Sequence, residues 1–245
     1  MLNFSLSKNI KFVELNPTGQ NGFDKFKSVL DEFYMNSESI LEIGGGSSPT
    51  YSPSSNFTVN DISSHELSLI KEKNYNTALF DICGKIPDSF NEKFDFCFSK
   101  MVLEHVSNGE LYYKNIFKIL KKGGTCITFH PTLFSVPFLI NYLMPEKISG
   151  WIFNTFLGKK TEILEDNKIK IIKFPAKYSY CFSTRKHKTN LEKIAFSDVK
   201  IISLYGHHYY RWFQLLYKFH KKISKLIRKN DIKFLSSYAY TIVQK

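Results

Sequence analysis

Cysteine is scarce in this 245-residue chain, and its four copies lie far apart. They occur at Cys83, Cys97, Cys126 and Cys181, so no C-x-x-C pair is present. This spacing excludes a cysteine zinc knuckle and a dithiol redox motif. We therefore expect buried, reduced thiols, which are typical of a cytoplasmic protein.

Long apolar runs, internal repeats and low-complexity linkers are also missing. No stretch reaches the roughly eighteen apolar residues that a transmembrane helix requires, and residues 1–11 lack the apolar core of a signal peptide. Hydrophobic residues make up 43% of the chain and aromatic residues 16%, which argues against disorder. These features predict a single domain over residues 1–245.

Acidic residues are rare in the second half of the chain. Residues 131–245 contain 21 Lys and Arg but only 7 Asp and Glu, a net charge of +14. Residues 1–130 contain 13 and 15, a net charge of −2, and the two halves sum to the +12 of the whole chain. A basic second half favours an anionic acceptor, a membrane surface or an acidic partner.

A short apolar segment, residues 40–43, leads directly into three glycines at positions 44–46. Glycine adopts unusual backbone dihedrals and has no Cβ, so a nucleotide-like ligand can approach this backbone closely. A dinucleotide-binding G-x-G-x-x-G motif would require glycine at position 49, where the chain has Pro49. The segment instead has the pattern E-x-G-x-G, which begins at Glu42.

Two further apolar segments each end in an acidic residue. Residues 57–61 end at Asp61, seventeen positions after Gly44, and residues 77–81 end at Asp81. A carboxylate at the carboxyl end of a parallel strand can accept hydrogen bonds from both hydroxyl groups of a ribose. Either acid could simply form a strand-end turn, but in this context we favour ligand contact.

The following segments continue the same order. A predicted strand at residues 94–99 precedes the sequence LEHV, which ends at Val106. A predicted helix at residues 112–120 ends at two lysines and two glycines, and a fifth strand at residues 125–129 precedes the dipeptide HP. We expect Asp95 to be structural because it opens a strand. Five linked motifs in order are far more specific than one glycine loop.

Residues 38–131 resemble the class I S-adenosylmethionine-dependent methyltransferases, in particular the small bacterial type 11 family. The resemblance implies an α/β fold with a doubly wound, mostly parallel seven-stranded sheet, a Rossmann-like methyltransferase fold with insertions after the fifth and sixth strands. It also implies that residues 38–131 form the core that binds S-adenosylmethionine and releases S-adenosylhomocysteine. Asp61 would hold the ribose, Asp81 would accept the adenine amino group, and Ile82 would pack beside the ring. The implied cofactor-binding residues are Glu42, Gly44, Gly45, Gly46, Asp61, Ile62, Asp81, Ile82 and Ser99.

Two histidines are candidate catalytic bases, His105 after the fourth strand and His130 at the end of the fifth. A base is needed only if the acceptor starts protonated, and His105 could equally brace the following helix. Some family members hold a metal with E-x-x-E-H, but here Met101 replaces the first glutamate. Since Glu104 and His105 alone offer too few ligands, we expect no metal.

Two insertions follow the cofactor core. Residues 132–186 form an acceptor-side insertion or lid, although their apolar segment 133–144 could be a core or dimer-interface helix. Residues 206–235 form a basic aromatic insertion whose apolar residues recur at helical spacing. That helix could pack on the sheet, contact a membrane surface or bind an acidic partner. The candidate acceptor-binding residues, which offer donors for phosphate or sugar oxygens, are His207, His208, Tyr210 and Arg211.

A last crossover helix at residues 187–196 and two closing strands at residues 198–204 and 237–243 complete the expected fold. We expect methyl transfer to an oxygen, or less favourably a nitrogen, of a small anionic acceptor related to glycans. Nucleotide- or lipid-linked sugars and phosphate or phosphoramidate substituents of a surface polysaccharide belong to this class. The chain would act in the cytoplasm, in contact with the inner membrane surface in one interpretation.

Two alternatives remain open: an RNA methyltransferase, and a noncatalytic protein that binds a partner or membrane. The net charge of the second half supports the RNA alternative. No RNA-binding module is visible, however, and the basic residues cluster on one helix, which argues against a nucleic-acid partner.

Overall fold

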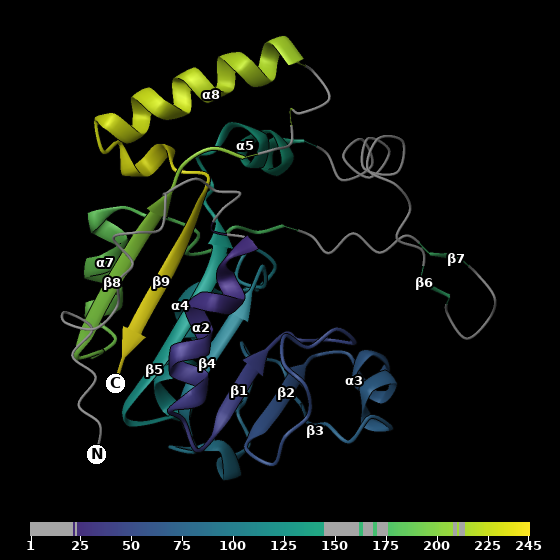
Figure 1. Ribbon diagram of the computed structural model, residues 1–245. Coiled ribbons are helices and arrows are strands. Elements are labelled where there is room, and N and C mark those ends of the chain that lie inside the picture. The colour runs from purple at the N-terminus through teal and green to yellow at the C-terminus, as the bar shows by residue number, and fades with distance from the viewer. Residues whose placement is uncertain are drawn as a thin grey trace.

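The computed structural model describes residues 22, 24–144, 162–163, 169–170, 176–207, 210 and 214–245. Figure 1 shows a central sheet with helices on both faces and two helices beyond the carboxyl ends of its parallel strands. No helix within these ranges is long and apolar enough to cross a membrane. The expectation of a lid at residues 132–186 falls partly outside these ranges.

A seven-stranded sheet forms the centre of the protein, in the order β3-β2-β1-β4-β5-β9-β8. The first five strands in sequence are parallel, and β9 runs antiparallel to both of its neighbours. The strands are β1 (Ile40–Ile43), β2 (Phe57–Asp61), β3 (Asn76–Leu79), β4 (Phe94–Lys100), β5 (Leu120–Pro131), β8 (Asp198–Leu204) and β9 (Tyr238–Gln244). The predicted doubly wound, mostly parallel seven-stranded sheet is confirmed. Its strand order reverses between β1 and β4, where ligands bind in such sheets.

Helices cover the sheet and the carboxyl ends of its parallel strands. In Figure 1, α2 crosses the near face, while α5 and α8 lie beyond the carboxyl ends of β5 and β8. The helices are α2 (Phe26–Met35), α3 (Ser64–Lys71), α4 (Gly109–Ile119), α5 (Val136–Leu143), α7 (Arg185–Glu192) and α8 (Gln214–Lys229). Two 3-10 turns, η2 (Asp88–Phe90) and η3 (Lys233–Leu235), and a separate two-stranded pair, β6 (Glu162–Ile163) and β7 (Ile169–Lys170), complete the described elements.

Short polar side chains set the beginnings of two of these helices. Ser63 precedes α3, and its hydroxyl accepts a hydrogen bond from the Glu66 amide. Asn108 precedes α4, and its side chain accepts from the Leu111 amide. Each cap satisfies a backbone N–H that has no partner within the helix. Both helices therefore begin soon after the turn that follows a strand. The two caps keep those turns at the carboxyl ends of the strands.

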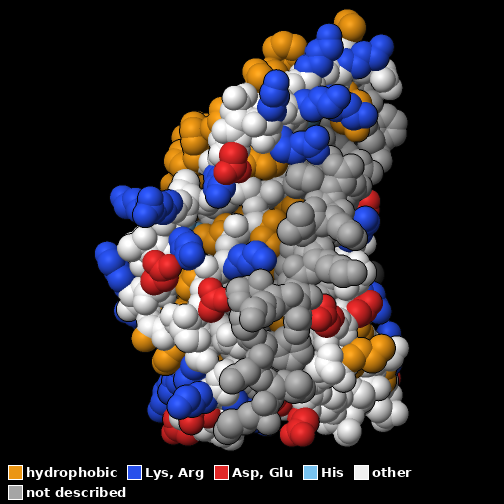
Figure 2. Space-filling view, turned by 60° about the vertical axis from the view of Figure 1, so that its left-hand side comes forward, with side chains coloured by type: hydrophobic (Ala, Val, Ile, Leu, Met, Phe, Trp, Pro, Cys, Tyr) orange, Lys and Arg blue, Asp and Glu red, His pale blue; other side chains and the backbone are white. Residues whose placement is uncertain are grey.

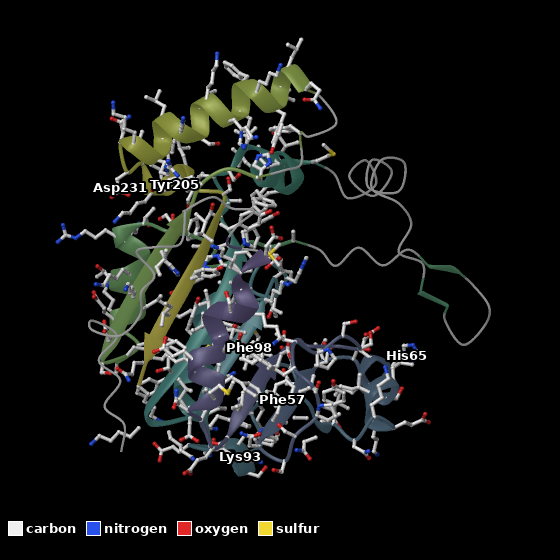
Figure 3. The ribbon with its side chains drawn as sticks, viewed as in Figure 1. Phe57, His65, Lys93, Phe98, Tyr205 and Asp231 are labelled. Atoms are coloured by element: carbon white, nitrogen blue, oxygen red, sulfur yellow. The ribbon has the colours of Figure 1, made fainter. Side chains whose placement is uncertain are left out.

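Aromatic side chains form much of the core on the face covered by α2. Phe57 of β2 and Phe98 of β4 lie on either side of β1, with nearly parallel rings whose centroids are 6.3 Å apart (Figure 3). Phe26 of α2 packs against Phe98 and Phe129 at 6.5 and 5.4 Å. All four side chains are almost completely buried. Stacking of this kind adds about 0.5–1.5 kcal/mol per pair to burial, and it fixes β1 between its neighbours.

The helix predicted at residues 112–120 corresponds to α4, and its predicted end was wrong by one residue. The helix ends at Ile119, and Leu120 is already extended and pairs with Phe94 at the beginning of β5. The side chain of Leu120 is completely buried, so the gain from placing it in the sheet outweighs another helical residue. Gly123 adopts a positive φ of 80° inside the strand, where its amide donates to the Lys245 carbonyl, and it does not cap the helix.

Candidate functional site

The glycine turn after β1 is too tightly packed for side chains. A Cβ on Gly44 would lie 2.6 Å from Cγ2 of Val102, and one on Gly45 would lie 2.7 Å from Cγ1 of Val59. Gly44 and Gly46 also have positive φ angles of 67° and 51°. The turn therefore needs glycine for both space and conformation, and its backbone lies at the carboxyl end of β1.

The buried side chain of Glu42 anchors the loop that contains this turn. Its carboxylate accepts hydrogen bonds from the Thr50 amide at 2.9 Å and the Thr50 hydroxyl at 2.6 Å. Burial raises the pKa of the Glu42 carboxyl, and the Thr50 hydrogen bonds oppose that shift. Since only 4% of Glu42 is exposed, the geometry gives it a positioning role for the loop.

Asp61 lies at the end of β2, beside the glycine turn. Its Oδ1 accepts from the Ser63 amide at 2.9 Å, and its Oδ2 would be 3.5 Å from a Cβ on Gly46. Burial raises its pKa, although the residue remains partly exposed. The neighbouring Ile62 is 64% exposed, so both residues are open to a ligand. A half-exposed carboxylate next to a bare backbone fits a ribose and its linked groups.

Glu66 also belongs to this cluster, and the sequence analysis missed it. Its Oε2 accepts a hydrogen bond from the Ser47 amide at 2.8 Å, which joins α3 to the glycine turn. The spacing Ser63-x-x-Glu66 has the form of a capping box, a signal that could have placed Glu66 at this edge. Here the carboxylate binds the glycine turn as well as lying at the first turn of its helix.

Asp81 lies two residues beyond β3 and is exposed. Its Oδ1 accepts from the Cys83 amide at 2.8 Å, which is the turn that strand-end aspartates commonly form. The adjacent Ile82 is 6% exposed, and its carbonyl accepts from the Asn115 side chain at 2.7 Å. Asp81 thus forms a turn, and it is also exposed at the carboxyl ends of the strands, as Asp61 is.

Ser99 does not face the candidate ligand site. The side chain is completely buried, and its hydroxyl lies 2.7 Å from the Tyr112 hydroxyl of α4. Tyr112 in turn lies 3.2 Å from the Thr128 hydroxyl. Since this network lies between the sheet and α4, it gives Ser99 a structural role.

The turn after β4 contains a buried carboxyl group beside a partly exposed histidine. Met101 opens the turn with a positive φ of 57°. Burial raises the pKa of Glu104 to about 8, and its Oε1 lies 3.8 Å from Nε2 of His105. The side chain of His105 is 37% exposed, so it can meet an acceptor. A carboxyl that is protonated near neutral pH can donate a hydrogen bond in a site of this kind.

The structure argues against His130 as a base. Its side chain is completely buried between β5 and β9, with Nε2 2.9 Å from the Thr241 hydroxyl and Nδ1 2.9 Å from the Pro131 carbonyl oxygen. Burial lowers its pKa to about 4. Both nitrogens have partners inside the sheet, so the ring cannot accept a proton from an acceptor outside it.

One candidate acceptor residue, His207, lines a basic cavity of about 530 Å³ between the end of β8 and α8. His207 contributes to it, its ring centroid 4.7 Å from that of Tyr210 and 4.0 Å from that of His220. His208 and Arg211 lie outside the described residues. The lining residues are Tyr205, Gly206, His207, Tyr217, His220, Lys221, Lys222, Ser224, Lys225 and Arg228.

The cavity and the glycine turn both lie at the carboxyl ends of strands, but they lie at different strands, β8 and β1. Four strand intervals separate β1 from β8, or roughly 19 Å at the usual spacing of about 4.8 Å between neighbouring strands. His207 is therefore too distant to contact a group held at the end of β1. Among the described residues, no three His, Cys, Asp or Glu side chains are grouped so that they could hold a metal ion.

Comparison with protein families gives a direct match for this region. Residues 41–128 match the family model described as a methyltransferase domain. These residues include the glycine turn, Asp61, Asp81 and the turn that contains His105. No curated protein matches the chain.

Solved structures with similar folds include S-adenosylmethionine-dependent methyltransferases. One from Archaeoglobus fulgidus has 15% identity and a TM-score of 0.50, with 91% of this chain and 94% of the other covered. Phosphoethanolamine N-methyltransferase 2 of Haemonchus contortus, solved with phosphomonomethylethanolamine and S-adenosylhomocysteine, has 13% identity and a TM-score of 0.51 over 92% of this chain and 53% of that one. The CMeT domain of the citrinin polyketide synthase has 13% identity and a TM-score of 0.53, with coverage of 91% and 52%.

The chain spans about half the length of the Haemonchus enzyme and of the polyketide synthase fragment. At sequence identities of 13–15%, the likeness to these solved structures shows the fold alone. The match to a methyltransferase domain comes from the family model. Residues 41–128 therefore match a methyltransferase domain, and the chain as a whole has the fold of S-adenosylmethionine-dependent methyltransferases.

Proposed function

We propose that the protein transfers a methyl group from S-adenosylmethionine to an oxygen of a small anionic acceptor related to glycans. The observation that carries this proposal is the cluster of the bare glycine turn, Asp61 and Glu66 at the carboxyl ends of β1 and β2. The family match covers this cluster. Asp61 and Asp81 would bind the ribose and the adenine, and the backbone of residues 44–46 would lie against the remainder of the cofactor.

The reaction needs alignment more than covalent help from the protein. The bound cofactor supplies a sulfonium methyl group, so a C–O bond forms as the C–S bond breaks and its electron pair remains on sulfur. The residues at the edge of the sheet must hold the acceptor oxygen about 3 Å from the methyl carbon, opposite the sulfur. His105 is the base we propose for a hydroxyl acceptor, because it is partly exposed and follows β4. An oxygen that is already anionic would require no base.

The charge distribution supports an anionic acceptor. The second half of the chain has a net charge of +14, against −2 in the first half. Phosphate-bearing molecules, such as nucleotide- or lipid-linked sugars or a phosphorylated polysaccharide substituent, are of this class. The Haemonchus neighbour is bound to a small phosphorylated amine, which makes phosphorylated amines a second group of acceptors to assay.

Calorimetric titration with S-adenosylmethionine and S-adenosylhomocysteine tests the cofactor site. Asp61→Asn should weaken binding by about 1–3 kcal/mol, because the carboxylate hydrogen bonds are lost. Asp95→Asn is the matched control, since Asp95 binds Ser39 and Lys121 at the opposite end of β4. Equal affinity in the Asp61 variant would remove that residue from the site.

Methyl transfer is then measured with labelled cofactor and a panel of phosphorylated sugars, their neutral counterparts, phosphorylated amines and RNA. Turnover of the phosphorylated sugars alone supports the proposal. Methylation of RNA alone would replace it with the nucleic-acid alternative. Failure of the wild-type protein to bind the cofactor would indicate the noncatalytic alternative.

A further inference from the structure

Helix α8 is amphipathic, but its polar face is turned toward the rest of the protein. Seven of its residues line the basic cavity beside β8, namely Lys222 at the border of the apolar face and six others. The six others recur at three- and four-residue steps, so they occupy one face of the helix. These six residues are Tyr217, His220, Lys221, Ser224, Lys225 and Arg228. Below them, Tyr205 donates a hydrogen bond to Asp231 at 3.1 Å, which ties the end of β8 to the chain beyond α8 (Figure 3).

The opposite face of α8 is an exposed apolar stripe. At 100° per residue its members fall within about one third of the helix circumference. They are Leu215 (85% exposed), Leu216 (44%), Phe219 (61%), Ile223 (38%) and Leu226 (60%). No described side chain of α8 is buried. A helix on a globular protein normally turns such a stripe toward the core, so the orientation of α8 requires a partner outside the described fold.

The charges on α8 select the partner. The helix contains six cations and no acidic residue, namely Lys218, Lys221, Lys222, Lys225, Arg228 and Lys229. Pairing the apolar stripes of two copies would bring Lys218, Lys222 and Lys229 of each helix into one interface, six cations whose repulsion opposes association. An anionic lipid surface offers both an apolar layer for the stripe and phosphates for the cations. We propose that α8 lies in the surface of an anionic membrane, with the apolar stripe inserted.

The arrangement of the lysines agrees with this orientation. Lys218, Lys222 and Lys229 border the stripe on one side, within about 60° of Leu215 on the helix circumference. Their aliphatic stems can lie beside the inserted residues while the amino groups reach the lipid phosphates. Figure 2 shows apolar and basic side chains together over the end of the molecule that α8 forms.

Exposed apolar side chains on neighbouring elements extend this surface. Phe234 of η3 is 50% exposed, and its ring centroid is 6.5 Å from that of Phe134, which is 41% exposed and precedes α5. On α5 itself, Val136 and Leu143 are 60% and 71% exposed. Since α5 and α8 both lie beyond the carboxyl ends of the strands (Figure 1), the edge that carries the candidate methyl-transfer site would face the membrane. The membrane contact does not depend on the proposed reaction.

Vesicle co-sedimentation of the whole protein tests the contact. We expect binding to vesicles that contain phosphatidylglycerol, weak binding to pure phosphatidylcholine vesicles, and a decrease as salt rises. Leu215→Gln with Phe219→Gln should reduce binding at least tenfold. The matched control is Met35→Gln, an 83% exposed apolar residue at the end of α2. Lys218→Gln and Lys229→Gln should each weaken binding about fivefold, the equivalent of about 1 kcal/mol per lysine.

Four outcomes would overturn the proposal. Equal binding to neutral vesicles, or no effect of the Leu215 and Phe219 substitutions, would exclude an inserted stripe. A dimer in sedimentation velocity that the same substitutions dissociate would assign the stripe to a second copy of the chain. Slow hydrogen exchange of α8 in a monomer without vesicles, unchanged when vesicles are added, would show that another segment of the chain covers it.

Discussion

Glu104→Gln separates the electrostatic cost of a buried carboxyl from its packing. Burial raises the pKa of Glu104 to about 8, from an ordinary value of 4.5. Within the described part of the chain, Oε2 is buried without a hydrogen-bond partner. Glutamine has nearly the same shape and no charge at any relevant pH, so it preserves the packing and removes the titration.

The sign of the effect follows from proton uptake. Between pH 4.5 and 8 the unfolded chain has lost the Glu104 proton, whereas the native protein retains it. The native state therefore binds more protons, and its free energy of unfolding falls as pH rises. Between pH 6.5 and 8 the two pKa values give a loss of about 1.5 kcal/mol, nearly the full 1.36 kcal/mol per unit except close to pH 8.

Urea denaturation at pH 6.5, 7.0, 7.5 and 8.0, followed by tyrosine and tryptophan fluorescence, measures this difference. The wild-type protein should lose about 1.5 kcal/mol more than the Glu104→Gln variant over that range. Glu110→Gln serves as the control, because Glu110 is exposed on α4 and its carboxylate binds Lys114 at 2.6 Å. Its pH dependence should match that of the wild type. Parallel curves for wild type and Glu104→Gln would refute the inference of a protonated carboxyl.

Three further measurements address the glycine turn, the anchor of its loop and the buried His187. Gly44→Ala should unfold at a lower urea concentration and bind S-adenosylmethionine poorly, because its Cβ would clash with Val102. Gly123 has a similar positive φ but no atom within 4 Å of an added Cβ, so Gly123→Ala should lose only the roughly 1–2 kcal/mol of backbone strain. Equal losses of stability in the two variants would exclude the clash with Val102. Thr50→Val should cost about 1–3 kcal/mol in urea unfolding, because Glu42 loses its hydroxyl partner, and no change would exclude that contact as an anchor. Burial lowers the pKa of His187 to about 3, so acidification from pH 6.5 to 4 protonates the unfolded chain first and lowers stability. His187→Phe should reduce that fall by about 3 kcal/mol in the same assay, and an identical fall would refute the assignment.

The sheet and the cofactor edge could be predicted because their signals are local. Strand patterns ending at Asp61 and before Asp81, with a glycine turn after Ile43, describe neighbouring strand ends in a parallel sheet. The structure agrees closely with those positions. Glu66 was missed because its hydrogen bond joins helix α3 to Ser47 of the glycine turn, nineteen residues earlier in the chain.

Side-chain direction was the part that the sequence could not supply. His130 and Ser99 occupy strand ends at the candidate site, yet their side chains point into the sheet network and toward α4. That choice depends on the strand register and on partners such as Thr241, 111 residues away. The periodicity of α8 predicted its apolar face correctly, but not that this face would point outward, because periodicity does not specify what lies beside a helix.

The position of β9 in the sheet has a consequence for synthesis. Residues 238–244 lie between β5 and β8, pairing Thr125 with Gln244 on one side and Asp198 with Gln244 on the other. Until the ribosome has released residue 244, β5 and β8 each present an unpaired edge to solvent. A nascent chain with two such edges is open to aggregation and to chaperones. Slow translation of the lysine-rich segment before β9 would lengthen that exposure, so the folding yield of this protein should depend on how quickly its last strand is made.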